Sequence, residues 1–164
     1  VADAFVRYGP SPTLVFRPDG KRVHASRIVV LLDGTPEAER IIRPALDLCE
    51  ASEARCTLLR VVSEEAGRES AEKALQQAGA SFGPGSIVIE TAVVVAHDVP
   101  QAVLTFAMDH CVDVIALTTR TTNPLRRALL GSVADALVRG GGRPVLICNP
   151  FTALDGSHGI ETRP

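Results

Sequence analysis

Gly131 and Ser132 are the residues of this chain whose type and position best suit the binding of an anion. They follow a polar loop that begins at Thr118, and an apolar segment with helical spacing comes directly after them. The N-terminus of a helix presents backbone N–H groups that have no partner within the helix, and the helix dipole adds positive charge there. Phosphate binding is therefore the chemistry that this pair favours. A purely structural N-cap is the alternative.

Asp33 is a second candidate, because it ends the short apolar run 27–32. Its carboxylate would either contact a ligand or only orient the turn that leads into the next helix. Thr35 and Pro36 mark the start of that helix, as the N-cap and the first helical residue. The arginines of the loop after Thr118 also have two possible roles: their side chains either contact a phosphate or lie in solvent. Solvated loop arginines are the commoner case. The loop arginines here are Arg120, Arg126 and Arg127.

Catalysis has no support at the level of residues. The four histidines are scattered, and no Ser/His/Asp set, Cys/His set or carboxylate pair can be argued from spacing. The four cysteines show neither a C-x-x-C pair nor a His at zinc-ligand spacing. Cys49, Cys111 and Cys148 lie in apolar stretches, so we interpret the cysteines as reduced core residues of a cytoplasmic protein.

Strands and helices are expected to alternate around these candidates. The patterns predict strands over 27–32, 56–62, 86–95, 112–117 and 144–148, and helices over 35–49, 64–79, 98–111 and 131–140. We expect Gly79 to end the second helix. This alternation is typical of an α/β fold: an open five-stranded parallel sheet with helices on both faces, Rossmann-like, in strand order 3-2-1-4-5. A ligand would then bind between Asp33 and the loop at Thr118, where the strand order reverses.

The N-terminus repeats the end of the last helix and strand. Residues 1–18 align with 133–150 without a gap, and ten of the eighteen positions are identical. We therefore expect a partial repeat over 1–18 (the last helix and strand of a preceding domain), a linker over 19–26, one complete domain over 27–150 and a tail over 151–164. The partial repeat is either a remnant or a native extension.

Composition narrows the classes of partner. The net charge is −2, so no broad basic surface for nucleic acid or anionic membrane is expected. No apolar run is long enough to span a bilayer, and 46% hydrophobic residues are ordinary for a globular domain. We expect neither nucleic-acid nor membrane binding.

The segment from Arg27 to Pro150 resembles the universal stress protein family. The resemblance rests on the Val-x-x-Asp-Gly-Thr end of the first strand, the Leu-Leu-Gly-Ser-Val-Ala segment and the Pro-Val-Leu-Ile end. The nucleotide-binding branch of the family carries Gly-x2-Gly-x9-Gly-Ser/Thr after strand four. Here the spacing and the final Gly131-Ser132 are kept, whereas Thr118 and Thr121 replace the first two glycines. Threonine is β-branched and tolerates close approach of phosphate poorly, although its hydroxyl can donate.

The resemblance implies an adenine nucleotide such as ATP, with magnesium, as a weakened ligand. Asp33 would approach adenine or ribose, Val61 or Val62 would border the base, and Gly131 and Ser132 would hold phosphate. The full set of candidate contacts is Asp33, Thr35, Val61, Val62, Thr118, Arg120, Thr121, Gly131, Ser132 and Val133.

Three functions follow from this reading: a regulatory stress-response module that binds nucleotide, a nucleotide-independent dimerisation module, or a slow ATP hydrolase. The related electron-transfer flavoproteins share the architecture, but nothing here indicates a flavin site.

The fifth strand should be an edge strand. In the resembled family this strand pairs antiparallel with its twin, within a homodimer or within one tandem chain. We expect Thr13, Leu14, Val15 and Phe16 to pair with Val145, Leu146, Ile147 and Cys148, in the same chain or in a neighbour.

Overall fold

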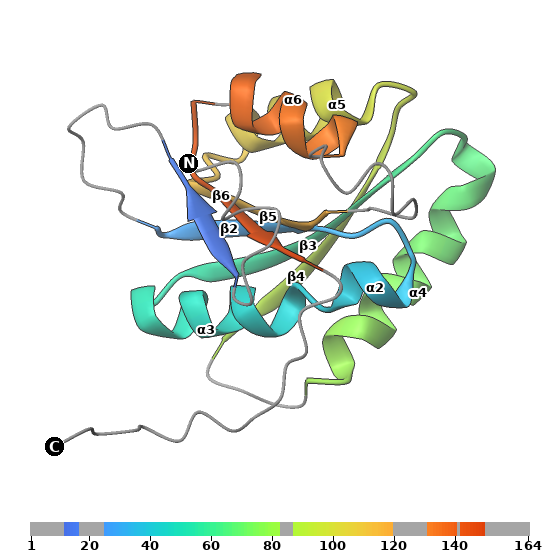
Figure 1. Cartoon of the computed structure of the whole chain (residues 1–164). Helices are drawn as coiled ribbons and strands as arrows, with labels where there is room; N and C mark the ends of the chain where they lie inside the picture. The colour runs from blue at the N-terminus through green and yellow to red at the C-terminus, as the bar shows by residue number, and fades with distance from the viewer. Residues whose placement is uncertain (1–11, 17–24, 83–86, 120–130, 141, 150–164) are drawn as a thin grey trace, which may run out of the picture.

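One six-stranded sheet lies between two layers of helices (Figure 1). The computed structural model describes residues 12–16, 25–82, 87–119, 131–140 and 142–149. The strands are β1 (Thr13–Val15), β2 (Arg27–Leu31), β3 (Arg55–Val62), β4 (Ile89–Val95), β5 (Val114–Thr118) and β6 (Val145–Cys148). The helices are α2 (Pro36–Glu39), α3 (Ile42–Ser52), a 3-10 turn (Glu65–Gly67), α4 (Arg68–Ala80), α5 (Val99–Asp109) and α6 (Ser132–Gly140).

The sheet runs in the order β1-β6-β5-β2-β3-β4. The five strands from β2 to β6 are mutually parallel and follow the predicted order 3-2-1-4-5, so the expected α/β fold is confirmed. The sixth strand, β1, runs antiparallel to β6, with Thr13 opposite Ile147 and Val15 opposite Val145. The helix expected before β1, most of the expected linker and the tail lie outside the described residues.

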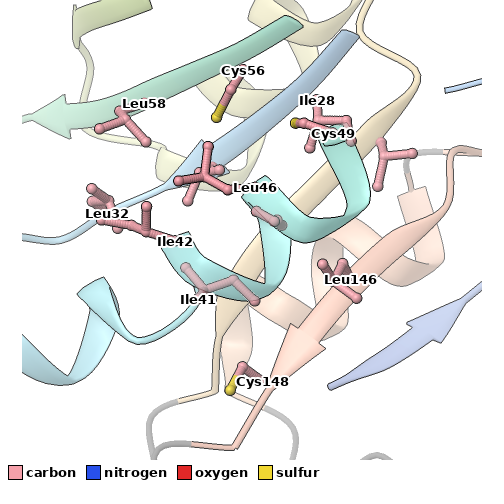
Figure 2. Packing of buried hydrophobic residues seen from close by; sticks show 14 of the residues in the cluster. Ile28, Leu32, Ile41, Ile42, Leu46, Cys49, Cys56, Leu58, Leu146 and Cys148 are labelled. Atoms are coloured by element: carbon pink, nitrogen blue, oxygen red, sulfur yellow. The ribbon is translucent and has the colours of Figure 1, made fainter. Parts of the chain in front are cut away.

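Two hydrophobic cores, one on each face of the sheet, hold the layers together. Neighbouring residues of β2 alternate between them, since Val30 belongs to the core under α2, α3 and α4, and Val29 to the core under α5 and α6. Figure 2 shows the first of these cores, in which Ile42 and Leu46 of α3 pack over β2 and β3. This division is what the period of two in a strand produces in a sheet covered on both sides.

The first helix is interrupted, contrary to the single helix predicted over 35–49. Thr35 caps α2 and Pro36 follows it as predicted, but α2 ends at Glu39 and α3 begins only at Ile42. The reason is Pro44, which has no N–H to donate and is tolerated only in the first turn of a helix. A new helix must therefore start just before it.

Two other sequence expectations were wrong. Gly79 does not end α4, which continues to Ala80. Cys111 is not a core residue but exposed, with φ +50° in the turn after α5. The other three cysteines are buried.

The Asp113 side chain fixes β2 beside β5 at the amino edge of the sheet. Its Oδ2 accepts the backbone N–H groups of Ser26 at 2.8 Å and Arg27 at 3.0 Å. The Asp113 N–H donates in turn to the Arg27 carbonyl, at 2.8 Å. Two strands far apart in the sequence are thereby aligned, which brings their carboxyl ends to the same place.

Candidate functional site

A pocket of about 340 Å³ opens at the carboxyl ends of β2 and β5. The strand order reverses here, because β2 continues to β3 on one side and pairs with β5 on the other. Such a crevice is where open α/β sheets bind their ligands, and the volume is within the usual range for small-molecule sites. Its lining residues are Leu31, Leu32, Asp33, Ala38, Val61, Val99, Leu117, Thr118, Thr119, Gly131, Ser132, Val133 and Ala134.

Only one of the two valines at the end of β3 contributes to the apolar lining of the pocket. Val61 lines the pocket, whereas Val62 does not. Adjacent residues of a strand point to opposite faces, and Val61 packs with the core under α5 and α6. Val62 instead faces the opposite layer, where its side chain lies 3.6 Å from the position that a Cβ of Gly67 would take.

Asp33 lines the pocket and also organises the turn that follows β2. Its Oδ1 accepts the backbone N–H of Thr35 at 3.0 Å and the Thr35 hydroxyl at 2.5 Å. Thr35 in turn accepts the Ala38 N–H, at 3.4 Å, as the N-cap of α2. Thr35 itself does not line the pocket, so it acts on the site by orienting Asp33 and by capping α2. Both readings of Asp33 from the sequence, ligand contact and turn formation, are thus compatible with its position.

The N-terminus of α6 forms one wall, where Gly131, Ser132 and Val133 line the pocket. The Gly131 carbonyl accepts the Asp135 N–H at 2.9 Å, which is the first turn of the helix. Gly131 therefore occupies the N-cap position, where it has no side chain to bond the following N–H groups. The positive end of the helix dipole faces the cavity at this wall.

Thr118 and Thr119 lie at the start of the loop after β5. The Thr118 hydroxyl donates to the Ala38 carbonyl at 3.3 Å, so it ties β5 to α2. Thr119 is the only buried polar residue among those described, and its hydroxyl donates to the Cys148 carbonyl at 3.5 Å. Both hydroxyl protons are used within the protein in this structure.

Arg120 and Thr121, with the loop arginines Arg126 and Arg127, lie outside the described residues. Of the ten predicted contacts, six line the pocket: Asp33, Val61, Thr118, Gly131, Ser132 and Val133. Across the described part of the chain, no group of three or more His, Cys, Asp or Glu side chains converges to hold a metal ion.

The sequence reading missed Ala38 and Val99, which line the pocket from α2 and α5. Both lie in the first turn of a helix, which Thr35 caps in α2 and Asp98 caps in α5. Helices that follow parallel strands begin at the carboxyl edge of the sheet. Their first turns could therefore have been proposed as pocket walls.

The profile of the universal stress protein family matches residues 24–149, which is most of the chain. The chain belongs to the universal stress protein family. No curated protein gives a significant match to the sequence.

Solved structures of the family share this fold at low identity. A universal stress protein in complex with cAMP is 23% identical, with a TM-score of 0.62 over 77% of this chain and 98% of its own. The universal stress protein from Archaeoglobus fulgidus in complex with dAMP is 17% identical, with a TM-score of 0.60 over 77% of this chain and 98% of its own. A second universal stress protein, from Archaeoglobus fulgidus DSM 4304, is 16% identical, with a TM-score of 0.70 over 90% of this chain but only 53% of its own.

None of the helices in the described residues is long and apolar enough to cross a membrane.

Proposed function

We propose that this universal stress protein is a regulatory stress-response module of the cytoplasm that works by binding an adenine nucleotide, with weakened affinity. The observation that carries the proposal is the pocket between Asp33 and the N-terminus of α6. It combines an apolar slot with an acceptor at one end and backbone donors at the other. Two structurally similar relatives are complexes with cAMP and dAMP, which supports the adenine class.

Each end of the pocket suits a different part of a nucleotide. Val61 and Leu117 offer apolar surface to a base, while the Asp33 carboxylate can accept a hydrogen bond from a ribose hydroxyl or an amino group. The N–H groups of Ser132 and Val133 suit phosphate, because they lie at the start of a helix. Magnesium would accompany a triphosphate as its counterion.

The weakened affinity follows from Thr118. Its β-branched side chain stands where the nucleotide-binding relatives have glycine, and its hydroxyl proton is engaged by Ala38. A phosphate approaching the backbone at this point would meet a side chain instead of open space. We therefore propose contacts at Asp33, Val61, Gly131, Ser132 and Val133.

Absorbance and thermal unfolding test the proposal. The chain has no Trp and one Tyr, so adenine retained through purification would dominate the near-ultraviolet spectrum. At a hundredfold excess over Kd, a nucleotide raises the free energy of unfolding by about 2.7 kcal/mol. We expect ATP with magnesium, or AMP, to raise Tm, and GTP to raise it less. A protein-only spectrum with unchanged Tm at millimolar nucleotide would refute the proposal.

A second candidate function is association through the edge of β6, independent of nucleotide. The observation that favours it is the pairing of Thr13–Val15 with β6, because this short separate strand covers the edge of β6, all four residues of which are buried. We propose that β1 acts as the last strand of a preceding repeat and forms an intramolecular pseudo-dimer contact. The match that covers 90% of this chain covers only 53% of the relative, so the relative is the longer protein, which supports a tandem arrangement.

Removal of residues 1–24 tests this second function. With β1 gone, the apolar β6 edge is exposed and should pair with a second copy. We expect the full chain to be a monomer and the shortened chain a dimer in light scattering. A shortened chain that stays monomeric and folded would contradict the association function, and it would leave the nucleotide proposal unaffected.

A further inference from the structure

The two edges of the sheet are closed in different ways. At one edge β1 pairs with β6, whereas β4 is the last strand at the other edge, and no described strand pairs with its outer side. An open edge presents backbone N–H and C=O groups that can pair with a strand of another chain. The outer side of β4 is therefore the place where this fold is most open to association.

The hydrogen bonds of β4 show which of its backbone groups face outward. Ala96, directly after β4, donates its N–H to the Val62 carbonyl of β3 at 2.8 Å, so residue 96 turns its backbone toward β3. Because successive residues of a strand alternate in this respect, residues 90, 92 and 94 do the same. The outward N–H and C=O groups of β4 belong to Ile89, Thr91, Val93 and Val95.

The sequence of this edge suits pairing with an identical strand. Residues 91–96 read Thr-Ala-Val-Val-Val-Ala, without a charge, a Gly or a Pro. Short segments of this composition, rich in β-branched residues, pair readily with copies of themselves. Thr91 is exposed, and Val93 and Val95 are half-buried. The segment carries no charge that would repel a second copy.

A single guanidinium covers the middle of the edge. Arg68 is the first residue of α4, and its Nη1 donates to the Val93 carbonyl at 3.1 Å. Glu65, in the 3-10 turn before α4, holds the guanidinium: its Oε1 accepts from Nε at 2.5 Å and its Oε2 from Nη2 at 3.3 Å. The hydrogen bond to Glu65 and its charge raise the pKa of Arg68. We call these three bonds the Arg68–Glu65 clasp.

The neighbouring ion pair on α4 does not reach the sheet. Lys73 Nζ donates to Glu69 Oε1 at 2.6 Å, and Lys73 makes no hydrogen bond to β4. Its side chain is 68% exposed, against 39% for that of Arg68. An exposed pair of this kind contributes little to stability. Substitution of Lys73 therefore removes the same charge from the same helix without touching the edge.

We propose that the outer edge of β4 is a pairing surface for β4 of a second copy of this chain, and that the Arg68–Glu65 clasp keeps this surface closed. The pairing is antiparallel about a two-fold axis at Val93, with Thr91 opposite Val95 of the second copy. In this register the two Val93 residues exchange both of their backbone hydrogen bonds. The carbonyl that each of them must use is the one that Arg68 occupies.

This surface is separate from the two binding functions proposed above. The strands β4 and β6 lie at opposite ends of the parallel part of the sheet. Neither the residues of the clasp nor the outward residues of β4 line the nucleotide pocket. Failure of the nucleotide proposal or of the β6 proposal therefore leaves this one standing, and its own failure leaves both of them unaffected.

Light scattering and amide hydrogen exchange of the full chain test the proposal. The Arg68→Ala variant is compared with the parent protein and with Lys73→Ala. We expect only Arg68→Ala to double its mass. Where nine-tenths of this variant is dimeric, the amides of Thr91, Val93 and Val95 should exchange about tenfold more slowly than in its dilute monomer, because exchange then proceeds from the remaining monomer.

Two further variants separate edge pairing from a general loss of stability. Glu65→Ala frees the guanidinium without changing α4, so it should give a smaller fraction of dimer. Adding Thr91→Lys to Arg68→Ala places a charge on the exposed edge and should restore the monomer.

Three results would overturn the proposal. In the first, folded Arg68→Ala keeps the mass of the parent, or, if that variant does not fold, Glu65→Ala does. In the second, Lys73→Ala associates as strongly as Arg68→Ala. In the third, the mass doubles while the amides of β4 exchange as fast as in the parent.

Discussion

Two helices on the same face of the sheet, α5 and α6, begin in opposite ways. The Asp98 side chain caps α5 by accepting the Gln101 N–H at 3.0 Å, so this helix brings its own carboxylate to its N-terminus. At the corresponding place α6 has Gly131, which has no side chain. Both starts border the same pocket, through Val99 in one case and Ser132 in the other.

This difference in capping indicates which helix N-terminus can bind a ligand. A bonded carboxylate at Asp98 already occupies the place that an anion would take, whereas the donors at the start of α6 are left to the cavity. The start of α2 resembles that of α5, because Thr35 caps it. Of the three helices whose first turns line this pocket, α2, α5 and α6, only α6 has a start without a side-chain cap, which suits phosphate.

The largest effect is expected from giving α6 the cap that α5 has. Gly131→Asp places a carboxylate where the phosphate would lie, so we expect nucleotide binding to weaken about 100-fold, which is roughly 2.7 kcal/mol. Gln76→Glu adds the same charge on an exposed position of α4 and should leave Kd unchanged. Titration calorimetry measures both. Equal losses in the two variants would show that only net charge matters.

The second-largest effect is a loss of stability expected from substitution of Gly34, in the turn between Asp33 and the α2 cap Thr35. Gly34 has φ +84°, which side chains rarely adopt, and it lies under the Arg60 guanidinium. We expect Gly34→Ala to lower the free energy of unfolding by about 1–2 kcal/mol. At Gly67, where φ is −83° and a Cβ would be 3.6 Å from its nearest neighbour, alanine should stabilise by about 0.4–1 kcal/mol. Urea unfolding with similar losses at both glycines would disprove this distinction.

Removal of the α5 cap should have a smaller effect. Asp98→Ala leaves the Gln101 N–H without its partner and should destabilise the protein by about 1 kcal/mol. Asp98→Asn keeps a cap and should stay within a few tenths of a kcal/mol of the parent. If asparagine destabilises as much as alanine in chemical denaturation, the charge of Asp98 and not its hydrogen bond stabilises α5.

The smallest effect is expected from a neutral cap on α6. Gly131→Ser should raise the free energy of unfolding by only a few tenths of a kcal/mol, since glycine is itself an acceptable N-cap. The same variant should weaken nucleotide binding far less than Gly131→Asp, because a hydroxyl does not repel phosphate. A loss of affinity equal to that of the aspartate variant would point to steric exclusion instead of charge.

Much of this arrangement could be predicted from the sequence, because local signals sufficed. Thr35 and Asp98 are capping residues directly before helical patterns, and both caps are present. The family resemblance also identified Asp33 and Gly131 as neighbours in space, and both line the same pocket.

The rest depended on packing that no local pattern records. Whether Val61 or Val62 faces the pocket depends on the register of β3 against β4, in which a shift of one residue exchanges the faces. Gly79 looks like a helix end, but α4 continues through it to Ala80. Pro44 is the exception, since its missing N–H is visible in the sequence and could have predicted the break before α3.

The pairing of β1 with β6 also has a kinetic side. Thr13 and Ile147 are partners although their positions differ by 134 in the sequence, which makes this the contact with the longest sequence separation in the sheet. Forming it closes a loop that contains all the other strands, and such contacts form slowly. During synthesis β1 leaves the ribosome before the other strands and stays unpaired until β6 has been made. Docking of this strand is therefore a natural final step of folding, and a stalled or truncated chain would display a sheet with one edge unsealed.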